Sequence, residues 1–242
     1  MNNSKDLAYM YDFYNENQLI GQNDDIKYYI QQVKQNNVKN VLVIGAGTGR
    51  VAIPLEKYVK VSALDFDQQR LCVLKEKNDR INIIYSDIAN YNDSKKYDMI
   101  IAPYSTLQFL HNKDLFPKIL NNIAKLLKEN GCLLFDVSES FNTKQESLNV
   151  ELVNKFSKKY NENVKILYTS KRNDEYIEFI IKYICQTSNK TYLEKEKYFY
   201  YDAKFFSDVI NNSLLKIINI DNGYGKKGFE HKHIYHCVLK GE

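Results

Sequence analysis

The sequence has few cysteines and none at metal-ligand or redox spacing. Cys72, Cys132, Cys185 and Cys237 stand far apart, without a C-x-x-C motif, which argues against a disulfide framework and favours isolated thiols in a reducing cytoplasm. A large excess of one charge is also missing, because 34 Lys and Arg face 30 Asp and Glu for a net charge of +4. This balance argues against a strongly basic nucleic-acid platform. The chain shows no N-terminal apolar run of signal length and no long hydrophobic segment, so we expect a cytoplasmic protein without a membrane span.

The most informative stretch runs from Val41 to Arg50 and reads V-L-V-I-G-A-G-T-G-R. Its β-branched and aliphatic residues predict a strand buried on both faces, and three alternating glycines follow directly. Glycines at this spacing let the backbone turn sharply and approach a ligand where any Cβ would clash. The ligand of such a loop lies at the carboxyl end of the strand, near a helix N-terminus. The stretch therefore predicts a site for a nucleoside-like cofactor.

This loop lacks the third glycine of a dinucleotide site, which would fall at Arg50. The next two expected strands both end in acids. V-K-V-S-A-L-D ends at Asp65, and I-N-I-I-Y-S-D-I carries Asp87 and Ile88. An acid at the first of these strand ends can accept hydrogen bonds from ribose hydroxyls, which NAD enzymes also require. The glycine spacing, rather than the acids, is what discriminates between cofactors.

The G-x-G-x-G loop and the strand-end acids resemble those of class I S-adenosylmethionine-dependent methyltransferases. The resemblance implies that the loop binds S-adenosylmethionine, with S-adenosylhomocysteine as the product. It implies that Asp65 receives the ribose and that Asp87 receives the adenine amino group beside Ile88. The predicted cofactor-binding residues are Tyr11, Gly45, Ala46, Gly47, Gly49, Asp65, Phe66, Asp87, Ile88 and Tyr104.

Three further features resemble a small-molecule branch that includes amino-sugar N,N-dimethyltransferases. They are the tyrosine-rich A-Y-M-Y-D-F-Y before the glycine loop, the stretch Y-D-M-I-I-A-P-Y-S-T-L-Q-F-L, and an antiparallel segment after the fifth strand. The resemblance implies methyl transfer to a small-molecule acceptor, first of all at an amine nitrogen. The candidate catalytic residues are Tyr14 to pack around the methyl and substrate, Ser105 to orient the nucleophile, and His111 as a general base. A surface position at a helix start is the competing interpretation of His111.

One residue departs from the family pattern. The first strand of the family usually reads V-L-D-[ILV]-G, and Val43 occupies the place of that acid here. The missing carboxylate normally helps to hold the methionine ammonium of the cofactor. Because of Val43, a non-catalytic protein that binds the cofactor remains an alternative interpretation. An RNA or protein methyltransferase and an O-methyltransferase of a small metabolite also remain open.

The order of the expected elements indicates an α/β fold with a doubly wound, mostly parallel, seven-stranded Rossmann-like sheet. We expect one domain with an N-terminal helical segment at 1–37, a cofactor-binding core at 38–137, an inserted lid at 138–201 and closing elements at 202–242. The lid is predicted as an antiparallel meander of three runs, at Val164–Ser170, Tyr176–Cys185 and Tyr192–Tyr201. A helix is expected at Leu115–Lys128, with Asn130-Gly131 as its stop. The oligomeric state is expected to be a monomer or a homodimer.

The C-terminal histidines do not predict a metal site. On a strand His231 and His233 share a face whereas His236 points away. Because metal ligands must converge, a surface strand explains this cluster better. We therefore predict no bound metal.

Overall fold

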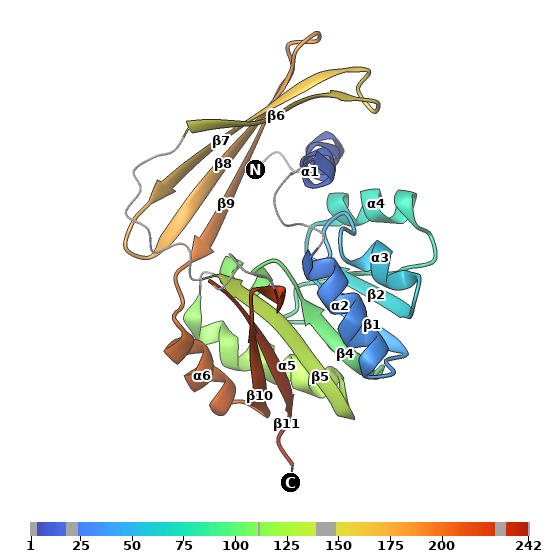
Figure 1. Cartoon of the computed structure of the whole chain (residues 1–242), viewed down its shortest axis with the longest axis vertical. Helices are drawn as coiled ribbons and strands as arrows, with labels where there is room; N and C mark the ends of the chain where they lie inside the picture. The colour runs from blue at the N-terminus through green and yellow to red at the C-terminus, as the bar shows by residue number, and fades with distance from the viewer. Residues whose placement is uncertain (1–3, 18–23, 111, 139–148, 226–230, 242) are drawn as a thin grey trace.

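The structure, a computed structural model, describes residues 4–17, 24–110, 112–138, 149–225 and 231–241. Its strands form two sheets (Figure 1). In spatial order the larger sheet contains β10 (Leu215–Asn222), β11 (Lys232–Leu239), β5 (Leu127–Ser138), β4 (Tyr97–Ala102), β1 (Asn40–Ile44), β2 (Lys60–Asp65) and β3 (Asn82–Tyr85). In the described chain, β11 is antiparallel to both of its neighbours, β10 and β5, and the other adjacent pairs are parallel.

Helices cover both faces of this sheet. One face packs against α2 (Asp24–Gln35), α3 (Ala52–Glu56) and α4 (Gln68–Lys77), and the other against α5 (Phe116–Leu126) and α6 (Ala203–Asn211). The sequence of α5 shows why, since Phe116, Ile119, Leu120 and Ile123 recur at helical spacing and all are buried. The arrangement confirms the predicted doubly wound Rossmann-like sheet.

The parallel strands end at one edge of the sheet. Ile44 of β1 is paired with Leu64 of β2, and Val43 with Ile101 of β4. The segments that follow these three strands therefore lie side by side. They are the glycine loop, the segment after Asp65 and the turn at Pro103.

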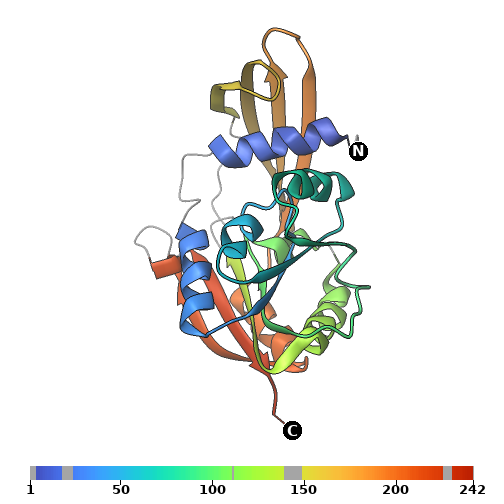
Figure 2. The same cartoon turned by 90° about the vertical axis from the view of Figure 1, so that its right-hand side faces the viewer.

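A four-stranded antiparallel sheet, called here the lid sheet, follows β5 in the chain. Helix α1 (Lys5–Asn17) packs on one face of it, where Met10 and Phe13 join Val164, Ile166 and Ile181 in one apolar cluster. In Figures 1 and 2, α1 lies between the lid sheet and α4 of the core. The lid strands are β6 (Asn149–Ser157), β7 (Glu162–Arg172), β8 (Tyr176–Cys185) and β9 (Thr191–Phe199).

Two local predictions are wrong. The lid sheet has a fourth strand, β6, where the sequence predicts a meander of three runs only. Helix α5 ends at Leu126 rather than Lys128, because the buried Leu127 is already extended and pairs with Tyr97 of β4. Asn130-Gly131 therefore lies within β5 and does not cap the helix. The next pair in that ladder is Met99 with Cys132, so the residues between form an irregularity in the strand.

None of the described helices is both long enough and apolar enough to cross a bilayer.

Candidate functional site

The glycine loop takes the conformation that its sequence predicts. Gly45, Gly47 and Gly49 have φ values of 66°, 53° and 93°, which side chains disfavour. A Cβ at Gly45 would lie 2.6 Å from the Thr106 side chain, so the loop and the turn after β4 touch closely. The Thr48 hydroxyl is buried and has no hydrogen-bond partner among the described residues. A buried polar atom without a partner inside such a loop fits a site where a ligand supplies the missing hydrogen bond.

The first strand-end acid faces this loop. Asp65 is 6% exposed, and its carboxylate accepts hydrogen bonds from the backbone N–H of Gly47 at 2.7 Å and of Asp67 at 2.8 Å. Burial raises the pKa of Asp65, and these two hydrogen bonds oppose the shift. The next side chain, Phe66, is 74% exposed. An anchored carboxylate next to an exposed aromatic ring suits a nucleoside, with the ribose at the first and the base at the second.

The second strand-end acid lies after β3. Asp87 is exposed, and its side chain accepts from the backbone N–H of Ala89 at 2.8 Å, whereas Ile88 is 6% exposed. Ala46 of the glycine loop is also buried, and its N–H donates to the carbonyl of Leu64 on β2 at 3.1 Å. Strands β2 and β3 are adjacent, so both acids belong to one edge.

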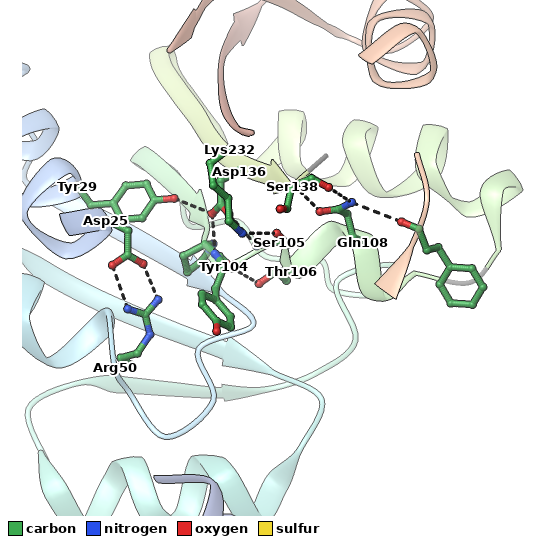
Figure 3. A network of polar contacts seen from close by, with 12 residues as sticks. Asp25, Tyr29, Arg50, Tyr104, Ser105, Thr106, Gln108, Asp136, Ser138 and Lys232 are labelled. Carbon is green, nitrogen blue, oxygen red and sulfur yellow. Dashed lines mark hydrogen bonds and ion pairs between the residues drawn. The ribbon is translucent and has the colours of Figure 1, made fainter. Parts of the chain in front are cut away.

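A strained turn follows β4. Tyr104 and Ser105 have φ values of 57° and 58°, a region that residues with a Cβ rarely adopt. The fully buried Asp136 of β5 accepts the Tyr104 N–H at 2.6 Å and the Ser105 N–H at 2.9 Å. The Tyr29 hydroxyl of α2 donates to the same carboxylate at 3.0 Å (Figure 3). Strain of this kind persists where surrounding contacts enforce it, and it is concentrated at functional sites.

Two cations flank the Tyr104 ring. The Arg50 guanidinium lies 5.0 Å from the ring centroid and is paired with Asp25 of α2 through hydrogen bonds of 3.0 and 2.5 Å. The Lys232 ammonium lies 5.6 Å from the same centroid and donates to the Ser105 hydroxyl at 3.2 Å (Figure 3). Burial lowers the pKa of Lys232, while the nearby Asp136 and Asp25 oppose that shift. The Ser105 hydroxyl is thus turned toward a partly buried lysine.

The N-terminal tyrosines lie against the cofactor loop and beneath the lid sheet. A Cβ at Gly47 would lie 3.3 Å from the Tyr11 ring, and the Arg70 guanidinium of α4 lies 3.8 Å from the Tyr11 centroid. Tyr14 is 9% exposed, and burial raises its pKa, with smaller contributions from Tyr104 and Tyr168. The structure therefore places Tyr11, Tyr14 and Tyr104, three of the predicted site residues, near one another.

Arg70 also reaches the lid sheet. Its guanidinium contacts Glu194 and lies 3.5 Å from Glu196, both on β9. Glu194 accepts a further hydrogen bond from the Tyr183 hydroxyl at 2.7 Å. An ion-pair cluster therefore connects α4 of the core to the last lid strand beside the tyrosines.

Sequence reasoning missed four residues of this site: Arg70, Asp136, Glu196 and Lys232. A signal existed for two of them. Asp136 is the lone acid of the apolar run C-L-L-F-D-V, and alternation in Y-L-E-K-E-K-Y puts Glu196 on one strand face with Tyr198. His111 lies outside the described residues. Among those described, no group of three His, Cys, Asp or Glu side chains is placed to hold a metal.

Comparison with known proteins identifies the core. Residues 41–131 match the model of a family described as a methyltransferase domain. Over these residues the chain is similar to methyltransferase domains. The match begins at the glycine-loop strand and extends into β5, so it includes the glycine loop, both strand-end acids and the strained turn.

The curated relatives that this chain matches include aminopropyltransferases and methyltransferases. The chain is 32% identical to a polyamine aminopropyltransferase of Clostridium botulinum over 125 residues, which are 46% of this chain and 44% of that protein. It spans about half the length of the curated relatives that it matches. This similarity therefore covers only part of each protein.

Solved structures match nearly the whole fold. An S-adenosylmethionine-dependent methyltransferase from Clostridium acetobutylicum has a TM-score of 0.80 at 18% identity, with 98% of both chains covered. A sugar N-methyltransferase from Streptoalloteichus has a TM-score of 0.79 at 10% identity, with 96% of this chain and 93% of that chain covered. The predicted fold is confirmed, the family model supports a methyltransferase domain over residues 41–131, and the structures that share the fold include S-adenosylmethionine-dependent enzymes.

Proposed function

We propose that this chain transfers a methyl group from S-adenosylmethionine to an amine nitrogen of a small-molecule acceptor. The observation that carries this proposal is the tyrosine cluster, which contains Tyr11, Tyr14 and Tyr104 and lies between the glycine loop and the lid sheet. Helix α1 and the lid sheet cover the carboxyl edge of the parallel strands, where the cofactor residues lie (Figures 1 and 2). A covered edge suits a small acceptor better than an RNA or a folded protein. The likeness to a sugar N-methyltransferase supports the same acceptor class.

The residues present fit the cofactor. Asp65 would hold the ribose, Phe66 and Ile88 would border the base, and the glycine loop would approach the methionine portion. When bound, S-adenosylmethionine supplies a methyl on a positively charged sulfur, and the bond to the acceptor forms as the carbon–sulfur bond breaks. Tyr11, Tyr14 and Tyr104 would exclude water and position the acceptor, and positioning supplies much of the rate enhancement in a displacement of this kind. Val43 is fully buried, so other groups must hold the methionine ammonium.

A second candidate function is transfer of an aminopropyl group to an amine. It is favoured by the 32% identity to a polyamine aminopropyltransferase over 125 residues. Both reactions require the same kind of acceptor, a neutral amine. They differ in the increment of mass that the acceptor gains, which mass spectrometry of the product resolves.

Calorimetric titration with S-adenosylmethionine, and separately with NADH, tests the cofactor. We expect S-adenosylmethionine to bind with a micromolar dissociation constant. Asp65→Ala should abolish that binding, because it removes the carboxylate that faces the glycine loop. Asp79→Ala is the matched control, since Asp79 is an exposed acid two residues beyond the last residue of α4, Lys77. Binding of NADH alone, or equal binding by the two variants, would contradict the proposal. Amines are then screened as acceptors with the donor that binds.

A further inference from the structure

A partly buried carboxylate lies within the tyrosine cluster. The Glu196 side chain is 13% exposed. Burial raises the pKa of six tyrosines, and the charge of Glu196 adds to the shift in each of them. These tyrosines come from α1, the turn after β4 and three lid strands. They are Tyr11, Tyr14, Tyr104, Tyr168, Tyr183 and Tyr198. Since their raised pKa values keep these phenols uncharged, Glu196 is an anion among neutral aromatic rings.

The cation that contacts Glu196 also lies close to other carboxylates. Among the described residues, Arg70 is the cation that contacts Glu196, at 3.5 Å. The same guanidinium contacts Glu194 and lies 3.5 Å from Asp67. Three carboxylates and one guanidinium leave the cluster with a net negative charge. Such an excess of carboxylates is balanced by a proton, in keeping with the raised pKa of Glu196, or by a further cation that arrives with a ligand.

A second observation also points to a ligand. Tyr14 is 9% exposed, yet no hydrogen bond of its hydroxyl is found in the part of the chain that the structure describes. The groups that act on its pKa include Tyr104, Tyr168 and Glu196, so this hydroxyl belongs to the cluster. This hydroxyl is not one of the fully buried atoms that lack a partner, so a group that arrives with the substrate can reach it.

We propose that Glu196 binds the acceptor as a protonated amine and takes its proton. The proposal rests on the function proposed above and narrows its acceptor to amines that arrive as ammonium ions. A carboxylate surrounded by aromatic faces is a recognition site for such cations. The Tyr14 hydroxyl has free lone pairs with which to accept a second N–H of the ammonium.

The proton transfer needs no further reactant. The ammonium N–H bond breaks, its electron pair stays on nitrogen as the nucleophilic lone pair, and the proton converts the Glu196 carboxylate to a carboxylic acid. The acid returns this proton to water after the product has left. Burial and the neighbouring Glu194 raise the pKa of Glu196 to about 7, while Arg70 and Tyr198 oppose the shift. A carboxyl with a pKa closer to that of an amine accepts its proton at a lower energetic cost.

The test compares small amines with alcohols of the same shape. Methylamine, cyclohexylamine and benzylamine, and the matching alcohols, are titrated calorimetrically with and without saturating S-adenosylhomocysteine. We expect the ammonium probes to bind the wild type more tightly than the alcohols. Glu196→Gln should weaken the binding of ammonium roughly 10- to 100-fold and leave that of the alcohols unchanged. In the wild type, ammonium affinity should fall as the pH is lowered through the pKa of Glu196, because a neutral carboxyl no longer attracts a cation.

Glu178→Gln is the matched control on the same sheet. Glu178 of β8 lies opposite Lys197 of β9 in the strand register. Alternation places both side chains on the sheet face opposite to that of Glu196. This variant should bind every probe as the wild type does. The proposal is wrong if ammonium probes bind no more tightly than alcohols, or if Glu196→Gln binds them like the wild type. The proposed function is wrong if S-adenosylhomocysteine does not bind the wild type. Glu196→Gln should bind S-adenosylhomocysteine as tightly as the wild type does.

Discussion

Asp136 lies where three segments of the core meet. Its carboxylate accepts hydrogen bonds from two consecutive backbone N–H groups of the strained turn and from the Tyr29 hydroxyl of α2. The Lys232 ammonium of β11 lies 4.0 Å away. A single buried acid therefore fixes the turn that presents Tyr104 to the glycine loop, and it does so from an apolar stretch of β5.

Asp136→Asn should destabilise the protein strongly. The amide brings N–H donors to a place where backbone N–H groups already donate, and it leaves Lys232 without its negative neighbour. We expect the free energy of unfolding to fall by about 2–4 kcal/mol in urea denaturation. Lys232→Met is the comparison, because it keeps all three hydrogen bonds of Asp136 and should cost less. An equal or smaller loss in Asp136→Asn would show that the carboxylate does not hold the turn.

Elements with clear apolar periodicity are predicted well from this sequence, and the edge strand of the lid sheet is not. Helix α5 and the buried strands β1, β2 and β4 appear where their apolar residues predict them. Strand β6 was missed because it lies at the edge of the lid sheet, and its run N-V-E-L-V-N-K-F-S mixes apolar and polar residues; even Phe156 is 56% exposed. A polar run gains strand structure only from its neighbour in the sheet, which local sequence does not encode.

The glycine loop has no room for a side chain at Gly45. Gly45→Ala places a methyl 2.6 Å from Thr106 at a φ of 66°. The loop or the turn after β4 must then move, so we expect S-adenosylmethionine binding in calorimetry to weaken at least about tenfold. Gly225→Ala is the control. It has a comparable φ of 78°, but its Cβ would meet nothing within 4 Å. Unchanged binding in Gly45→Ala would exclude a close approach of cofactor and loop.

At the scale of the whole molecule, α1 connects the lid sheet to the core. Its Asp12 is paired with Lys77 of α4 at 2.6 Å, and its Asp6 accepts hydrogen bonds from Tyr160 and Tyr192 of the lid. The candidate site is assembled across this junction from residues 70, 136, 196 and 232. The glycine loop could be predicted because it is continuous in sequence. The proposed acceptor side could not, because only the packing of the lid on the core brings these distant residues together.

Arg70 is the guanidinium that spans this junction, so its removal tests whether the lid sheet is held to the core there. Arg70→Met keeps much of the side-chain volume but leaves Glu194 and Glu196 buried without their cation. We expect faster amide hydrogen exchange in β9 and α1, and a loss of stability on the order of 3 kcal/mol. Arg80→Met should change neither, because Arg80 pairs with Glu56 at the surface, with 69% of its side chain exposed. If exchange in β9 is the same in both variants, the ion-pair cluster does not hold the lid, and the apolar contacts of α1 with the lid sheet must do so alone.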